Sequence, residues 1–264
     1  MKRVKETVRR LAAGGTAAAL RHRSTPLPEI DGVLLVVAPH PDDETLGCGG
    51  LIARQAAAGR RVHVLFVTDG EASHEGHPEL QPADLGRQRR DEAVAALGEL
   101  GIVNPRSAAT FLGAPDGRLN RLDTDERSAV IDVLAKWIRA DRPEAVCTPF
   151  LGGGSSEHDA TTAMVRAALG PTSGVALFEY PIWAWWNALR LGGQVRNATA
   201  NFRLQLGPLR AAKLRALRCH RSQVEPVAPW TEPVLPPAIV EPCTGPTEFY
   251  FRTTAPAVNG DSGR

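Results

Sequence analysis

A short apolar run that ends in four ionisable side chains constrains the fold of this chain more than any other feature. Residues 33–38 are apolar, rich in branched side chains and too few for a buried helix, a pattern that predicts a central strand covered on both faces. The ionisable residues that follow are His40, Asp42, Asp43 and Glu44. They lie just past the carboxyl end of the predicted strand, where open α/β sheets place their ligand crevice. Charges crowded in this way would repel one another and lose hydration unless a positive group lay among them, so we expect a divalent cation.

The kinds of ligand in this motif narrow the choice of metal. Imidazole together with carboxylate suits Zn²⁺ or another first-row metal better than Mg²⁺ or Ca²⁺, which prefer oxygen alone. In a turn that enters a helix, positions i and i+3 lie on the same side, so His40 and Asp43 can converge on one ion. Asp42 then points elsewhere and is free to act as a base. Helix capping would account for one acidic residue in a first turn, but not for three beside a histidine.

The motif and its surroundings resemble a known family. Ala38-Pro-His-Pro-Asp-Asp-Glu44 is similar to the AHPDDE signature of the PIG-L/LmbE-like family of zinc-dependent N-acetylglucosaminyl deacetylases. Further blocks occur in the family's order at residues 64–70, 89–93, 111–117 and 213–223. The resemblance therefore spans about residues 33–225, which makes it far more specific than one motif. It implies a single three-layer, Rossmann-like α/β domain with a mostly parallel sheet and the active site at the carboxyl ends of the strands.

A second motif follows a predicted strand at Glu144–Pro149, where a glycine-rich loop leads into a helix. His158 in this motif matches the family's second histidine ligand, so the resemblance implies a metal set of His40, Asp43 and His158 with an open position for water. The family usually has HPDH here, whereas this chain has Ser155 and Glu157 in place of the first histidine and the aspartate. Serine cannot carry the positive charge with which that histidine assists the reaction. Losing a positioned donor of this kind costs on the order of a hundredfold or more in rate.

The resemblance also implies residues that bind the substrate. These are Arg89, Asp116, Ser155, Tyr180 and His220. Simpler interpretations stand beside these roles: Arg89 can form a helix-surface pair with Glu92, Asp116 can form a turn, and His220 can cap a helix.

Three of the five tryptophans lie at Trp183, Trp185 and Trp186, directly after a predicted strand at Val175–Glu179. Clustered aromatic residues most often belong to the core or to a contact between subunits. A stacking wall for a sugar or an apolar aglycone is the alternative. A long polar loop holds His74 and His77, for which exposure to solvent is the simpler interpretation.

Composition bounds the remaining classes. With 264 residues, 43% of them apolar and 23% charged, and a net charge of +2, the chain is typical of a globular protein and carries no nucleic-acid signature. The four cysteines are far apart, which excludes a zinc ribbon and favours a reducing compartment. We therefore predict a cytoplasmic protein, with a homo-oligomer left open.

The domain plan has three parts. Residues 1–28 are basic and predict an amphipathic helix that packs on the domain edge, with weak attachment to a membrane surface as the alternative. Residues 29–252 form the deacetylase-like domain, and residues 253–264 read as a disordered tail. No segment reaches the ~20 apolar residues that a transmembrane helix needs.

The functional expectation is a hydrolase. We expect Zn²⁺ to activate a water that removes an acetyl or other acyl group from the nitrogen of an N-acetylglucosamine-type conjugate, with Asp42 as the base. Two alternatives are a metal-dependent amidase or esterase for a non-sugar substrate and a catalytically impaired sugar-binding relative, which the serine at position 155 would favour.

Overall fold

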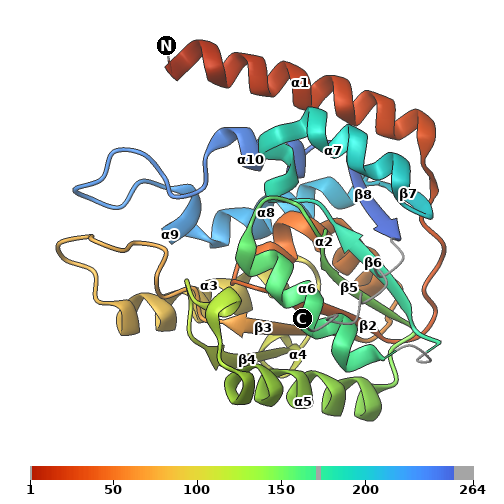
Figure 1. Cartoon of the computed structure of the whole chain (residues 1–264), viewed down its shortest axis with the longest axis horizontal. Helices are drawn as coiled ribbons and strands as arrows, with labels where there is room; N and C mark the ends of the chain where they lie inside the picture. The colour runs from red at the N-terminus through yellow and green to blue at the C-terminus, as the bar shows by residue number, and fades with distance from the viewer. Residues whose placement is uncertain (1, 171–173, 253–264) are drawn as a thin grey trace, which may run out of the picture.

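A mostly parallel sheet organises the molecule. The structure is a computed structural model and describes residues 2–170 and 174–252. Within them the chain forms eight strands in the order β1-β7-β8-β6-β5-β2-β3-β4 (Figure 1). The run from β6 to β4 is parallel, whereas β8 is antiparallel to both of its neighbours. The strands are β1 Thr25–Pro26, β2 Leu34–Ala38, β3 Val62–Thr68, β4 Ala109–Ala114, β5 Ala145–Pro149, β6 Ala176–Tyr180, β7 Ala200–Gln205 and β8 Thr247–Arg252.

Strand β2 lies inside the sheet between β5 and β3, and all five of its residues are buried. Leu34 and Val36 face one apolar core, whereas Leu35 and Val37 face the other. A strand with apolar side chains on both faces needs a layer of helices on each side. The predicted central strand is therefore confirmed.

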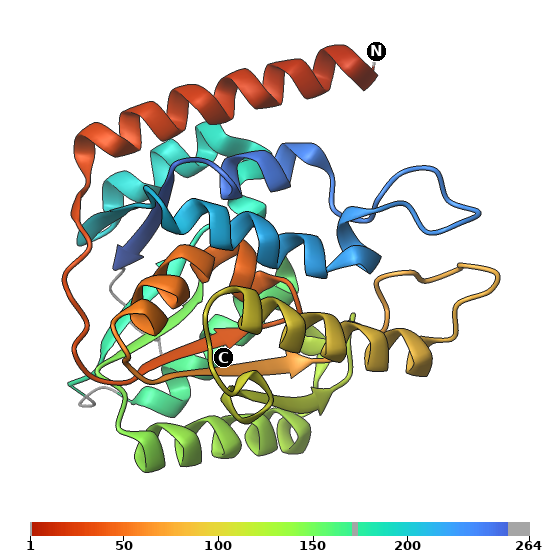
Figure 2. The same ribbon diagram turned by 180° about the vertical axis from the view of Figure 1, so that it is seen from behind.

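Helices cover both faces of the sheet, as the two opposite views show (Figures 1 and 2). The side chains of α5 and α6 join the core behind Leu35, and those of α2, α3 and α8 join the core behind Leu34. The predicted three-layer α/β fold is confirmed. The longer helices are α2 Asp43–Ala57, α3 Pro82–Glu99, α5 Thr124–Asp141, α6 Ser156–Leu169 and α8 Leu209–Cys219. The short helices are α4 Pro105–Ala108, α7 Ala188–Gln194, α9 Arg221–Val224, α10 Pro237–Cys243, and the 3₁₀ helices η1 Leu119–Arg121, η2 Trp183–Asn187 and η3 Val195–Asn197.

The basic amino-terminal segment forms helix α1, Lys2–Arg23, which runs along α7 and α10 (Figures 1 and 2). It buries Ala13 and Leu20 against the core, and Arg10 Nε lies 2.6 Å from a carboxylate oxygen of Glu241. This arrangement fits the predicted role of packing on the domain edge. None of the helices formed by the described residues combines the length and apolar character that crossing a bilayer requires.

The carboxyl-terminal third departs from the sequence prediction. Apolar and basic residues alternate at helical spacing over 204–216 and predict a helix, but β7 ends at Gln205 and α8 begins at Leu209. From residue 226 on, the proline-rich sequence predicts only a brief strand at 248–252, yet α10 forms there in addition to β8. Pro237 occupies the first turn of α10, where its missing N–H costs nothing. The predicted tail, 253–264, lies outside the described residues.

Candidate metal centre and active site

The turn after β2 is built by its own side chains. Asp42 has φ = 147°, a backbone conformation that L-residues rarely adopt. Two carboxylates hold the turn: Asp43 Oδ2 accepts the backbone N–H of His40 at 3.1 Å, and Glu44 Oε2 accepts that of Asp42 at 3.0 Å. Such strain costs about 1–3 kcal/mol and persists where the surroundings over-determine it. The turn separates Asp42 from Asp43, as the spacing predicted.

Two histidines meet at the carboxylate of Asp43. His40 Nδ1 lies 3.1 Å and His158 Nε2 lies 3.3 Å from Asp43 Oδ2. The ligand atoms of all three side chains lie within 4.8 Å of one another. A tetrahedral zinc site with ligand distances of ~2.0–2.2 Å places its ligand atoms roughly 3.3 Å apart. Asp43 Oδ2 thus lies at about this spacing from both imidazole nitrogens.

The ring nitrogen of His158 supports this interpretation independently. The side chain is only 2% exposed, and Nε2 forms no aligned hydrogen bond with any described residue. A buried polar atom without a partner costs about 1–3 kcal/mol, so it needs an explanation. A cation bound between His158 and Asp43 would provide the missing partner. The donor set therefore fits Zn²⁺.

The opposite nitrogen of His40 contacts two further carboxylates. Its Nε2 lies 2.9 Å from Glu157 Oε2 and 3.1 Å from Asp116 Oδ1. Burial opposes a charge on this ring, but the carboxylates around it raise the pKa of His40 well above the usual range. A carboxylate on the far nitrogen fixes the tautomer and orientation of a metal-binding histidine. Glu157 was not predicted as a site residue; its signal was its place in the second motif.

Glu157 is itself held firmly. Its carboxylate accepts the backbone N–H groups of Leu119 at 2.7 Å and Gly117 at 3.1 Å. Asp116 accepts the N–H of Ala72 at 2.8 Å. Through these contacts, the loops after β3 and β4 and the start of α6 are linked to the imidazole ring of His40.

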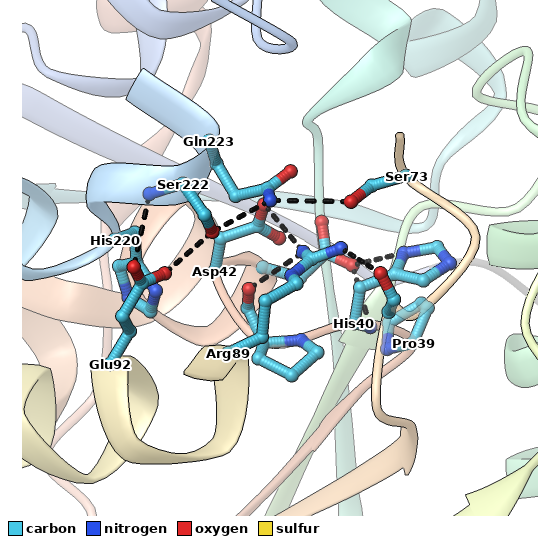
Figure 3. Close-up of polar contacts among 12 residues, drawn as sticks. Pro39, His40, Asp42, Ser73, Arg89, Glu92, His220, Ser222 and Gln223 are labelled. Carbon is cyan, nitrogen blue, oxygen red and sulfur yellow. Dashed lines mark hydrogen bonds and ion pairs between the residues drawn. The ribbon is translucent and has the colours of Figure 1, made fainter. Parts of the chain in front are cut away.

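Asp42 pairs with Arg89 from α3 (Figure 3). Arg89 Nη2 donates to Asp42 Oδ2 at 3.0 Å and to Pro41 O at 2.8 Å, and Nη1 donates to Gly70 O at 2.7 Å. A Cβ atom at Gly70 would lie 2.1 Å from Arg89 Nη1, so only glycine fits there. Burial raises the pKa of Asp42 to about 7, although the Arg89 charge acts against this rise. Such a carboxyl group can accept and return a proton near neutral pH.

These residues open into a pocket of about 240 Å³ between the loops after β2, β3 and β4 and the segment before α10. Its lining comprises His40, Asp42, Asp43, Ala72, Ser73, Arg89, Asp116, Gly117, Ser155, Trp183, Gln223, Val234 and Leu235. A larger hollow of about 410 Å³ lies near the amino ends of the strands, beside Val33 and Val62. The groups of possible metal ligands among the described residues share His40, and three of their members, His40, Asp43 and Asp116, line the smaller pocket, which is therefore the candidate site.

Two of the predicted substrate-binding residues lie beneath the pocket. Tyr180 is fully buried and donates its hydroxyl to Val37 O at 2.9 Å. His220 is also fully buried, and its Nε2 contacts Glu44 Oε1 at 3.0 Å. Because neither belongs to the lining, neither is placed to contact a ligand held there. His220 supports the first turn of α2 instead, which sequence reasoning missed because its partner lies 176 residues away.

Ser155 lies in the pocket wall and caps α6. Its Oγ accepts the backbone N–H of His158 at 3.4 Å. His220 cannot replace the missing histidine from its buried place. His74 stacks on Trp230 at 5.2 Å, and neither residue lines the pocket. His74 and His77 are buried rather than exposed, which corrects the simpler interpretation of that loop.

The tryptophan cluster divides between the two expected roles. Trp185 is 2% exposed and lies in the core, 6.1 Å from Phe249 between ring centroids. Trp183 is half-buried and lines the pocket. Trp186 is 40% exposed and carries the guanidinium of Arg9 at 3.8 Å from its ring centroid.

Comparisons with known proteins point to the same family that the sequence motifs resemble. A profile of the family described as PIG-L, GlcNAc-PI de-N-acetylase, matches residues 35–169. The chain is 29% identical to a 1D-myo-inositol 2-acetamido-2-deoxy-alpha-D-glucopyranoside deacetylase of Rhodococcus erythropolis, over 88% of this chain and 94% of that protein. Alignments with several other curated relatives cover about half of each chain.

Solved structures share the fold at low identity. An N,N'-diacetylchitobiose deacetylase from Pyrococcus horikoshii has a TM-score of 0.54 and 21% identity, over 73% of this chain and 70% of that one. A 4-carboxy-2-hydroxymuconate hydratase from Pseudomonas putida has a TM-score of 0.55 and 22% identity, over 71% and 78%. At such identities the likeness concerns the fold alone. Because the family profile covers half of the residues and includes both histidine motifs, the chain belongs to the PIG-L, GlcNAc-PI de-N-acetylase, family.

Proposed function

We propose that this protein is a zinc-dependent hydrolase that removes an acetyl or another small acyl group from the nitrogen of an N-acetylglucosamine-type conjugate. The observation that carries the proposal is the convergence of His40 Nδ1 and the buried His158 Nε2 on one carboxylate oxygen, Asp43 Oδ2, at 3.1 and 3.3 Å. The full-length relative is named a deacetylase of such a conjugate, which supports the substrate class. Zinc bound by these three residues would polarise the acyl carbonyl and lower the pKa of a water toward ~7.

Asp42 is the proposed base. It accepts a proton from the attacking water as the new C–O bond forms, and it returns that proton to the amide nitrogen as the C–N bond breaks. The products are a carboxylate and a free amino sugar. A pKa near neutrality suits both transfers, because the group must exist in both forms at the working pH. Arg89 keeps the carboxylate oriented through the 3.0 Å contact.

With Ser155 in the second motif, the pocket lacks the imidazole that the family usually has at this position. The pocket lining offers uncharged donors, the hydroxyl groups of Ser155 and Ser73 and the amide of Gln223, but no second imidazole beside His40. Gln223 Nε2 donates a hydrogen bond to Ser73 Oγ at 3.3 Å, and both residues line the pocket (Figure 3). Stabilisation of the developing oxyanion would therefore rest mainly on a bound cation. We expect turnover to be slower than in an enzyme with a positioned imidazolium.

The deciding experiment measures acetate release from N-acetylglucosamine glycosides by the purified protein, together with its zinc content. We expect one zinc ion per chain and release that stops with a chelator and resumes when zinc is added back. Release that continues in the metal-free protein would contradict the proposal. A panel of N-acyl and ester substrates without a sugar separates this function from a general amidase or esterase.

Ser155 stands where the second motif of the family has its first histidine. This difference favours one alternative, a sugar-binding relative with little turnover. It predicts saturable binding of the same glycosides to the zinc-loaded protein without acetate release. Acetate release and calorimetric binding, measured on the same preparation, distinguish the two functions.

A further inference from the structure

A second hollow adjoins the candidate site. Its volume is about 390 Å³, and Trp183 lines both it and the 240 Å³ pocket beside the metal ligands. The two also meet along the chain, because Gly154 lines the second hollow and Ser155 lines the first. Ligand pockets usually enclose about 300–1,000 Å³, so a conjugate larger than one sugar must extend beyond the first pocket. Because Trp183 lines both hollows, a conjugate that leaves the first pocket across this side chain would reach the second.

The two hollows differ in charge. Three aspartates and one arginine, Arg89, line the pocket at the metal ligands, whereas the lining of the second hollow contains no acidic residue. Its charged member is Arg190, on α7, and its other polar side chains are Asn187 and Gln194. Arg190 is exposed and forms no ion pair with any described carboxylate. A second cation lies beside this hollow, because Arg9 covers the ring of Trp186, which also lines it.

We propose that the part of the substrate beyond the N-acetylated sugar carries a negatively charged group, a phosphate or a carboxylate, which Arg190 binds in this second hollow. This inference rests on the proposed function for the orientation of the substrate. A guanidinium group donates paired hydrogen bonds that match either anion. Trp183 provides the apolar wall between the acetamido end and the charged end. The charge of the second hollow thus selects among conjugates that present the same sugar to the metal ligands.

The test uses three glycosides of N-acetylglucosamine with the same short alkyl linker, ending in a phosphate, a carboxylate or a hydroxyl group. Binding is measured by calorimetry on zinc-loaded Asp42→Asn protein, so that the result does not depend on turnover. We expect at least one charged glycoside to bind about fivefold or more tightly than the hydroxyl compound. Whichever of the phosphate and carboxylate glycosides binds more tightly identifies the charged group that the second hollow prefers. The preference should shrink as the salt concentration rises, because exposed charges are screened.

Two further substitutions in the same background assign the preference to one residue. Arg190→Gln should bring the ratio of affinities for charged and neutral glycosides close to one. Arg196→Gln, in the neighbouring η3 helix and outside the lining, should leave the ratio unchanged. Equal affinities of the charged and neutral glycosides, failure of the charged glycosides to bind, or a preference that survives Arg190→Gln would overturn the inference. Acetate release from the hydroxyl glycoside by the unmodified protein reports separately on the proposed function.

Discussion

Arg89 Nη2 lies 3.0 Å from Asp42 Oδ2 in a place that solvent barely reaches, since both residues are less than 5% exposed. The pair joins the middle of α3 to the strained turn after β2. Asp42 therefore lies between a buried cation and the metal ligands, where burial and charge oppose each other.

Replacing Asp42 by asparagine should abolish most of the acetate release while zinc stays bound. The change removes the proton acceptor but none of the three proposed ligands, so we expect the rate to fall about 10²–10⁴-fold. Acetate release and metal content of the same sample measure the two effects. Asp132→Asn, on the exposed surface of α5, is the matched control. Full activity in Asp42→Asn would refute the assignment of the base.

Asp42 should also make the metal-free protein less stable as the pH rises. Burial raises its pKa from 3.8 to about 7 on folding. Between these values the folded state holds a proton that the unfolded state has lost, so the free energy of unfolding falls with rising pH, by up to about 1.4 kcal/mol per pH unit from this group. Urea unfolding with a chelator, at pH 5 and pH 7, should show Asp42→Asn gaining stability relative to the unmodified protein. A difference that is independent of pH would contradict this.

Glu157 should control metal affinity without binding the ion. Its carboxylate lies 2.9 Å from the Nε2 of His40, so Glu157→Gln would loosen the ring that Asp43 approaches from the other side. We expect the zinc dissociation constant to rise about 10-fold to 100-fold. Competition with a fluorescent zinc chelator measures it. Asp159→Asn is the control, because this carboxylate accepts the N–H of Gly152 and does not contact the ring; an equal loss there would remove the special role of Glu157.

Introducing the missing histidine should raise turnover. Ser155→His places an imidazole in the pocket wall at the cost of the α6 cap, which contributes about 1 kcal/mol. We expect the rate constant kcat to increase about tenfold, less than the full effect of a preorganised donor, and the melting temperature to fall. Ser155→Ala loses the same cap without adding a donor, so it should melt earlier with no gain in kcat. No gain in Ser155→His at full zinc occupancy would show that another group has taken over the role.

The buried ion pair of Lys213 and Glu248 should contribute to the stability of the fold rather than to catalysis. Lys213 Nζ donates to Glu248 Oε1 at 2.6 Å and to Leu46 O at 2.8 Å. Glu248 also accepts the backbone N–H groups of Gly50 and Leu51. Lys213→Met leaves an uncompensated buried carboxylate, so it should lower the free energy of unfolding by about 3–5 kcal/mol. The double variant Lys213→Met/Glu248→Gln should recover part of this loss in urea unfolding; no recovery would contradict the pairing argument.

Local patterns predicted the centre of the fold well. The apolar run before His40 marks a strand with two buried faces, and the spacing of His40 and Asp43 places both on one side of a helix start. The family resemblance was needed to identify His158 as a metal ligand, because its approach to Asp43 depends on the pairing of β2 with β5. That pairing joins segments more than one hundred residues apart, and no local pattern encodes it.

The misplaced residues fail for a similar reason. Tyr180 ends a strand at the correct edge of the sheet, but its ring turns inward over Gly47, where a Cβ atom would lie 2.2 Å from it. His220 turns toward Glu44, whose fully buried carboxylate in the first turn of α2 gains a further partner at Oε1 beside the backbone N–H of Asp42 at Oε2. Both choices depend on the three-dimensional surroundings of a side chain. Sequence alone identifies such polar residues as important without saying which face of the site they support.

The proposed metal ligands follow two different strands, β2 and β5. The order in which these strands are synthesised therefore determines when the metal site can form. A chain that grows from its amino end presents His40 and Asp43 long before His158 exists, and two ligands bind an ion far more weakly than three. Capture therefore waits until both halves of the sheet have been made and have met, with Val36 opposite Cys147. An ion held there would link the segment of β5 and α6 to the segment of β2 and α2, so that scarcity of metal in the cell would lower the yield of mature protein as well as its turnover.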